Sequence, residues 1–202
     1  MYLFVFTFLI LSILGLYTEL FSLRMAMVSS NQTIAAEAMM FWHGAVYTYV
    51  RDNKTSITTV PATGSTISLN SSVCGLPAFT KGEISGKTYL PTDYNTTNDV
   101  ELNFSTILYQ TNGDYFVITY LNPTAIKLGY TADQLYKQMQ NADLPQVSYG
   151  RVQQNTTCIG GTNGNWLVTQ EYVNGTQICY PVPSTVTAIS DGATGIISNI
   201  GS

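Results

Sequence analysis

Two Asn-Gly pairs, Asn112-Gly113 and Asn174-Gly175, constrain the fold of this chain more than any other feature. Each pair stands between two runs of β-forming residues, and Asn-Gly readily adopts the positive φ angles of a two-residue hairpin turn. The flanking runs cover residues 100–110, 115–121, 166–173 and 176–180. The sequence therefore predicts two antiparallel hairpins. The run YFVITYL over 115–121 is apolar on both faces, which indicates a central, covered strand.

The remaining β and helical signals are weaker. Alternation and turn residues predict a strand over 147–153 and short strands over 56–60 and 65–69. A capping box formed by Thr131 and Gln134 predicts a short helix over 131–142. The last residues, 184–202, are small and Gly-rich with little alternation. We expect either a docked edge segment or a loose tail there.

Residues 33–50 predict an amphipathic helix that ends near Arg51. One apolar stripe recurs at spacings of three and four along Ala35, Met39, Trp42, Val46 and Tyr49. So broad an apolar face requires a partner, and we expect it to pack on the sheet. His43 is the only histidine and lies opposite this stripe. Without a second histidine, a cysteine or a carboxylate nearby, its expected role is structural.

The N-terminus carries an almost uncharged apolar run over 2–17. A membrane-spanning helix needs about 20 residues, a length that is reached by extension to Leu23, just before Arg24. No basic residue precedes the run and no Ala-x-Ala site follows it, so we favour an uncleaved signal anchor. The alternatives are a cleaved signal peptide and pilin-type processing after Gly15.

The chain contains three cysteines, Cys74, Cys158 and Cys179. Cys158 and Cys179 bracket the second Asn-Gly turn, and a disulfide between them is plausible in an oxidising compartment. Closing a loop of that size contributes roughly 3 kcal/mol. The alternative is a pair of buried thiols. If the bridge forms, Cys74 is either a free thiol or part of an intermolecular disulfide.

The sequence contains no recognisable catalytic or metal-binding motif. It lacks a G-x-S-x-G elbow, a P-loop and metal-ligand spacing, and Gly160 to Gly164 is interpreted as a turn. Asp99 and Glu101 are expected at a solvated strand edge. A net charge of −4 with only eight Lys and Arg excludes a basic nucleic-acid-binding face. We therefore predict a protein that is not an enzyme, with no cofactor, metal, small-molecule substrate or nucleic-acid partner.

Seven N-x-S/T triplets keep open an extracellular adhesin or a viral or eukaryotic surface glycoprotein as the alternative function. They begin at Asn31, Asn53, Asn70, Asn95, Asn103, Asn155 and Asn174. The competing interpretation is a bacterial extracytoplasmic domain that is simply rich in Thr and Asn.

The stretch AAEAMMFWHGAVYTYV over 35–50 resembles the start of PilM-type proteins of type IVb pilus systems, found with conjugative thin pili. Their helix has the form A-E-x-x-x-x-(Y/W)-x-x-A-V-x-x-Y. The matching residues are Ala36, Glu37, Trp42, Ala45, Val46 and Tyr49. The resemblance implies a helix-packing motif and no catalytic residue. It implies a non-enzymatic component of a pilus or conjugation apparatus, acting in pilus assembly through contacts with other pilus-assembly or pilin subunits.

Together these features predict an α+β, pilin-like fold. In it, an N-terminal membrane-anchoring helix continues into an amphipathic helix packed on an antiparallel β-sheet. The expected parts are a transmembrane signal anchor over 1–23, an amphipathic helix over 24–53, an extracytoplasmic antiparallel sheet domain over 54–183 and a small-residue tail over 184–202. The expected localisation is single-pass in the inner membrane, with residues 2–23 in lipid and the C-terminal domain periplasmic or extracellular.

Overall fold

A computed structural model describes ten parts of the chain: residues 36–80, 83–84, 87–90, 104–121, 136–137, 147–158, 163–173, 176–183, 189 and 191–201. One long helix covers 36–52, and a 3₁₀ turn, Lys54–Ser56, follows it. The strands are β1 (Ser65–Ile67), β2 (Glu83–Ile84), β3 (Lys87–Thr88), β4 (Phe104–Thr111), β5 (Asp114–Leu121), β6 (Ser148–Thr157), β7 (Asn163–Val173), β8 (Thr176–Pro181) and β9 (Thr194–Gly201).

The two predicted hairpins are confirmed. Strands β4 and β5 pair from Phe104 opposite Leu121 to Thr111 opposite Asp114. The turn between them has φ angles of 53° at Asn112 and 90° at Gly113, the left-handed pair that an Asn-Gly hairpin uses. Strands β7 and β8 also pair antiparallel, down to Val173 opposite Thr176.

The C-terminal strand β9 occupies the middle of the sheet. The described strands form a seven-stranded antiparallel sheet in the order β1-β4-β5-β9-β6-β7-β8, and β2 and β3 form a separate pair. Strand β9 joins β5 to β6, and its residues 194–198 are all buried. The expected edge segment or loose tail is therefore a central strand. A strand that is covered on both faces shows no polar alternation, which is why its sequence pattern is weak.

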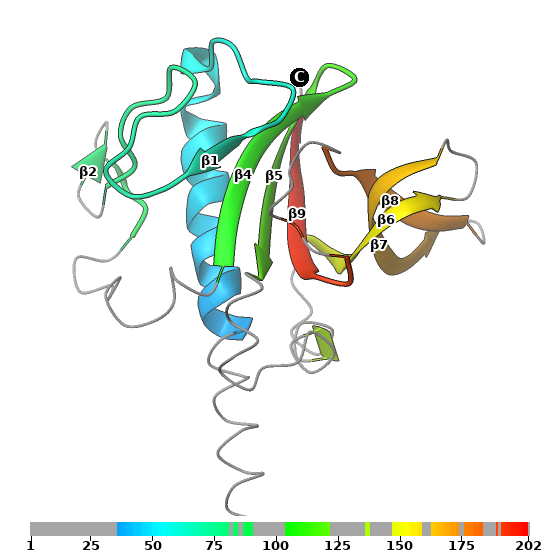
Figure 1. The fold of residues 1–202 in the computed structure, drawn as a ribbon. Coiled ribbons are helices and arrows are strands. Elements are labelled where there is room, and N and C mark those ends of the chain that lie inside the picture. Colours follow the sequence, from blue (N-terminus) through cyan, green and yellow to red (C-terminus); the bar gives the residue numbers. More distant parts are fainter. Residues whose placement is uncertain are drawn as a thin grey trace, which may run out of the picture.

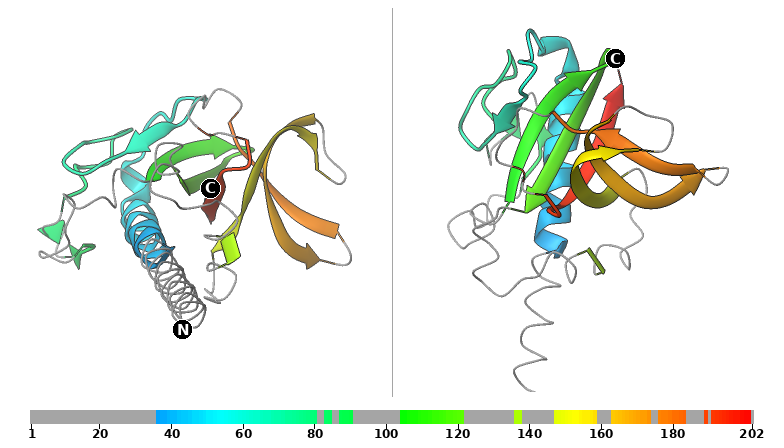
Figure 2. Two further views of the ribbon diagram at one scale, coloured as in Figure 1. Left: turned by 60° about the horizontal axis from the view of Figure 1, so that its bottom comes forward. Right: turned by 45° about the vertical axis from the view of Figure 1, so that its right-hand side comes forward.

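The helix lies against one face of the sheet, and Figures 1 and 2 show it running alongside β4 and β5. Its buried residues share a core with Leu108, Val117 and Ile196. A second core lies on the opposite face and joins β4, β5 and β9 to β6 and β7. The same figures show β6, β7 and β8 as a ribbon that curls away from the helix. The sheet therefore folds partly over itself, with one apolar core on each face.

Glycines make the corner at which the sheet curls. Gly150 of β6 pairs with both Gly195 of β9 and Thr169 of β7. A Cβ atom on Gly150 would clash with the carbonyl oxygen of Val168. Only a residue without a side chain permits this approach of two strands. Tyr109 of β4 then donates a 2.7 Å hydrogen bond to the carbonyl of Pro181, which ties β8 back over the second core.

The pilin-like α+β prediction is wrong. The described chain is mostly antiparallel sheet with a single long helix, and the sheet has a second core that a simple helix-on-sheet arrangement lacks. The predicted anchor over 1–23 and most of the predicted helix over 131–142 lie outside the described residues. No helix in the described part is long and apolar enough to cross a membrane. This finding contradicts the predicted single-pass inner-membrane localisation.

Two alanine substitutions test this account of the glycines. Gly44 lies in the helix, and a Cβ there meets nothing within 4 Å, so Gly44→Ala should stabilise the fold by about 1 kcal/mol through helix propensity. Gly150→Ala should destabilise it by about 2 kcal/mol because the β6–β7 backbone must move. Urea unfolding measures both. A neutral effect of Gly150→Ala would contradict the proposed corner.

Candidate functional site

A buried network of polar side chains is centred on His43. The His43 Nδ1 atom lies 2.9 Å from Thr119 Oγ1 of β5, and Nε2 lies 2.9 Å from Ser198 Oγ of β9. Thr119 is in turn 2.8 Å from Thr106 Oγ1 of β4, which accepts a 2.9 Å hydrogen bond from Trp42 Nε1. The network connects the helix to three adjacent strands.

His43 lies on the packed face of the helix, not opposite it as the sequence predicted. The buried row Ala36, Met39, His43, Val46 and Val50 runs at helical spacing, with His43 at its centre and 0% exposed. The predicted stripe lies slightly too far round the helix because it was chosen from apolar residues alone. His43 is polar but buried, so the prediction left it out. The expected structural role of His43 fits this position.

The contact between His43 and Ser198 resembles a catalytic dyad in distance only. A nucleophilic serine must reach substrate, and here His43 is fully buried while Ser198 is 3% exposed. Burial lowers the pKa of His43 to about 3, so the imidazole is neutral at physiological pH. A neutral imidazole has one donor and one acceptor nitrogen, and the two hydroxyls use both. The network joins the helix to the sheet and offers no chemistry to a ligand.

Because His43 is the only histidine, its titration can be isolated. The unfolded chain takes up a proton near pH 6.5, whereas folded His43 stays neutral down to about pH 3. Its contribution is complete above pH 6.5 and is lost progressively as the pH falls toward 3. We expect the free energy of unfolding to fall by about 2 kcal/mol from pH 7 to pH 5.

The matched control is His43→Gln, in which that pH dependence should disappear while the carboxylate contributions remain. Urea unfolding of both proteins at pH 7 and pH 5 measures the difference. If His43→Gln does not fold, the imidazole resonances of the wild-type protein give the answer. An imidazole that titrates near pH 6.5 in the folded protein would contradict the buried, neutral assignment.

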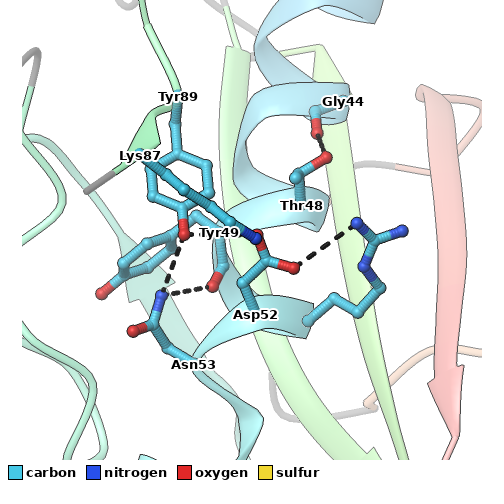
Figure 3. Close-up of polar contacts among 8 residues, drawn as sticks. Gly44, Thr48, Tyr49, Asp52, Asn53, Lys87 and Tyr89 are labelled. Carbon is cyan, nitrogen blue, oxygen red and sulfur yellow. Dashed lines mark hydrogen bonds and ion pairs between the residues drawn. The ribbon is translucent and has the colours of Figure 1, made fainter. Parts of the chain in front are cut away.

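A second polar cluster lies at the C-terminal end of the helix, as Figure 3 shows. The Asp52 carboxylate lies 2.8 Å from Lys87 Nζ of β3 and 3.4 Å from the Arg51 guanidinium. The hydrogen bond from Lys87 holds the pKa of Asp52 below its usual value, helped by the charges of Lys87 and Arg51. A carboxylate at a helix C-terminus is unfavourable for the helix dipole, and these cations offset that effect.

The same end of the helix is held by Asn53 and Tyr49. The Asn53 side chain donates a 2.8 Å hydrogen bond to the carbonyl of Tyr49, and Tyr49 donates from its hydroxyl to the carbonyl of Pro77. Burial, with the neighbouring charge of Tyr89, raises the pKa of Tyr49 to about 12. These contacts tie the helix to the segment that follows it. We interpret the cluster as a structural clamp.

The predicted site residues are found in two separate places. Cys158 and Cys179 form a disulfide with a Cα–Cα distance of 6.3 Å, and Cys74 is a free, partly buried thiol. Of the helix motif, Ala36, Trp42, Ala45, Val46 and Tyr49 are buried and Glu37 is exposed. The motif therefore supplies packing surface. The disulfide joins the end of β6 to β8 and lies beside residues that the sequence did not predict to form a site.

Those unmarked residues line a surface pocket of about 310 Å³ at the curled end of the sheet. Tyr136 and Lys137 line it together with residues of three strands, most of them polar. The strand residues are Arg151 and Gln153 of β6, Val168 and Thr169 of β7, and Gln177 of β8. Cys179 pairs with Val168 across β7 and β8, so the disulfide holds the β8 wall in place.

The pocket combines positive charge with amide donors. Lys137 is exposed, and the Arg151 guanidinium carbon lies 5.1 Å from the centre of the Tyr136 ring. Gln177 donates to the Thr169 carbonyl at 2.7 Å, which fixes its orientation. The lining residues that the structure describes include no Asp or Glu. Sequence reasoning missed this site because its two cations are far apart in the chain and belong to no motif.

Comparison of the chain with protein-family models, with curated proteins and with solved structures found no match.

Proposed function

We propose that this protein is a non-enzymatic binding module that works through contacts with other proteins. The observation that carries the proposal is the cationic pocket on the curled β6–β8 ribbon. The buried His43 network is inaccessible to ligands, and the Asp52 cluster is used to hold the helix end. The pocket is thus a place in the described chain where polar residues are grouped at the surface, beside a disulfide.

Pilus assembly or conjugation is the particular setting that we propose for this binding. Its support is the helix motif, in which Trp42, Val46 and Tyr49 pack into the core as a packing motif requires. The disulfide adds support because such bonds persist in oxidising compartments, where surface appendages are assembled. The partners would be other pilus-assembly or pilin subunits.

Deletion of the gene tests this setting. The deletion strain should lose assembled pili in electron micrographs and should transfer DNA at a strongly reduced frequency. A plasmid copy of the wild-type gene should restore both, and so should a Gly44→Ala copy, which leaves the pocket intact. Normal pili and normal transfer in the deletion strain would contradict the proposal.

A surface glycoprotein is the second candidate, and one observation favours it. Asn70 begins a sequon, is exposed and lies in a turn with φ of 62°, where a glycan meets no packed surface. Asn53 also begins a sequon, but its amide nitrogen is used in the hydrogen bond to Tyr49. Under this alternative, peptide mass spectrometry of the native protein should find a glycan on Asn70 and none on Asn53. An unmodified Asn70 would count against it.

A further inference from the structure

We propose that the disulfide between Cys158 and Cys179 is a redox-sensitive latch for the curled β6–β8 ribbon. In the oxidised protein it holds the outer end of the β6–β7 hairpin, where Thr157 pairs with Asn163, close to β8. Reduction by a dithiol releases that end, while the helix and both cores stay folded. The effect of the latch on the pocket rests on the proposed binding function, but the opening of the ribbon does not.

The first support is that β6 and β8 are not neighbours in the sheet, since both pair with β7, which lies between them. Cys158 follows Thr157, which pairs with Asn163 at the outer end of the hairpin. Cys179 of β8 pairs with Val168, five residues further along β7. In a flat sheet this offset and two strand spacings would separate the two cysteines by about 20 Å, but their Cα atoms are 6.3 Å apart. The disulfide therefore joins two points that only a strongly curled ribbon brings together.

The two strand ladders contain irregularities that permit this curl. The pairing of β6 with β7 shifts register between Gln153 and Thr156. The pairing of β7 with β8 shifts between Val168 and Tyr172. Bulges of this kind bend a strand and increase its twist, and Figure 2 shows the three strands curling away from the rest of the sheet. Bulged ladders permit a range of curvature, and a covalent bond between β6 and β8 restricts that range.

Trp166 lies on the face of β7 that the disulfide crosses. Its neighbours on that face are Gly164 and Val168, and Val168 is opposite Cys179. A Cβ atom on Gly164 would lie 3.5 Å from Trp166 Nε1, so the indole reaches toward the outer end of the hairpin. The Nε1 atom is buried, although the residue as a whole is only half-buried. The indole nitrogen is therefore a local reporter of whether the ribbon is closed.

The rest of the ribbon is held by contacts other than the disulfide. Neither cysteine is among the described residues of the two apolar cores. Tyr109 donates a 2.7 Å hydrogen bond to the carbonyl of Pro181, and the hydroxyls of Ser148 and Tyr180 lie 2.9 Å apart. Val182, just after β8, is buried in the second core. The opening of the latch is therefore local.

Thiol–disulfide exchange opens the latch. A thiolate of the dithiol attacks the sulfur of Cys179, which is half-buried, whereas Cys158 is only 9% exposed. Cys158 leaves as a thiolate and takes up a proton. The second thiol of the reductant then attacks the mixed disulfide, releases Cys179 and closes a disulfide within the reductant. Two electrons and two protons pass from the dithiol to the two cysteines.

The latch lies beside the pocket. Arg151, Val168 and Cys179 form one cross-strand row, because Val168 pairs with both of the others. Arg151 and Val168 line the pocket, and so does Gln177, two residues before Cys179 on β8. A change in the curl of the ribbon therefore alters the spacing of the strands that form the pocket wall. Binding at the pocket thereby becomes sensitive to the thiol redox state of the compartment.

The experiment compares the oxidised full chain with the same protein in dithiothreitol by ¹H–¹⁵N NMR. The chain has two tryptophans, so Trp42, whose Nε1 donates to Thr106 between helix and sheet, is an internal control for Trp166. All samples carry Cys74→Ser, which removes the free thiol. We expect reduction to shift the Trp166 indole signal and to speed exchange of its N–H hydrogen about tenfold or more, because the closed loop no longer restrains the ribbon. Exchange at Trp42 should change by less than about twofold.

A variant separates the latch from side effects of the reductant. The double variant Cys158→Ser, Cys179→Ser should show the reduced Trp166 signal without dithiothreitol and should not change when dithiothreitol is added. A double variant with the oxidised Trp166 signal would overturn the latch. If the double variant does not fold, reduction of the folded Cys74→Ser protein gives the same comparison.

Two results of the reduction experiment also overturn the latch. One is a Trp166 signal that does not respond to reduction. The other is a collapse of both indole signals to unfolded positions, because the disulfide would then hold the whole fold. Normal pili with the double serine variant, in a strain whose deletion parent lacks pili, would overturn the control of the pocket and leave the proposed function standing. Normal pili in the deletion strain would overturn the pilus setting and leave the NMR result intact.

Discussion

A neutral histidine buried between the helix and the sheet holds the two parts of this fold in register. His43 reaches Thr119 on β5 and Ser198 on β9, each at 2.9 Å, and both strands are central in the sheet. A buried polar group that loses its partner costs about 1–3 kcal/mol, so the helix cannot rotate or slide without breaking several such contacts. Trp42 strengthens the restraint through Thr106 of β4. Apolar packing alone would hold the helix with less directional precision.

The other face of the sheet depends on a different restraint, the absence of a side chain. Gly150 and Gly195 pair at the junction of β6 and β9, and the sheet bends there because nothing projects between the strands. The bend brings Val152 and Leu167 over Phe116 and Ile118 and so creates the second core. It also turns the outer face of β6 and β7 toward Tyr136, which forms the pocket. The pocket is thus a consequence of how the core is closed.

The few charges of the chain are used in two ways. At the helix end, Lys87 and Arg51 neutralise Asp52, and the ion pairs remain inside the molecule. At the curled ribbon, Lys137 and Arg151 come together with no acid among the described lining residues. The two clusters look alike in composition, since each contains two cations. At the helix end the protein itself supplies the carboxylate that lies between the cations.

The sequence by itself determined the features that depend on neighbouring residues. The Asn112-Gly113 hairpin and the central position of β5 were predictable, because turn conformation and apolar runs are local properties. The central place of β9, the inward position of His43 and the pocket were decided only by tertiary structure. Thr119 and Ser198 lie 76 and 155 positions from His43, and no local pattern shows that such partners exist. A polar residue on a helix is expected to face solvent unless its hydrogen-bonding partners inside the protein are known. A cationic pocket is likewise invisible until the sheet bends and brings its residues together.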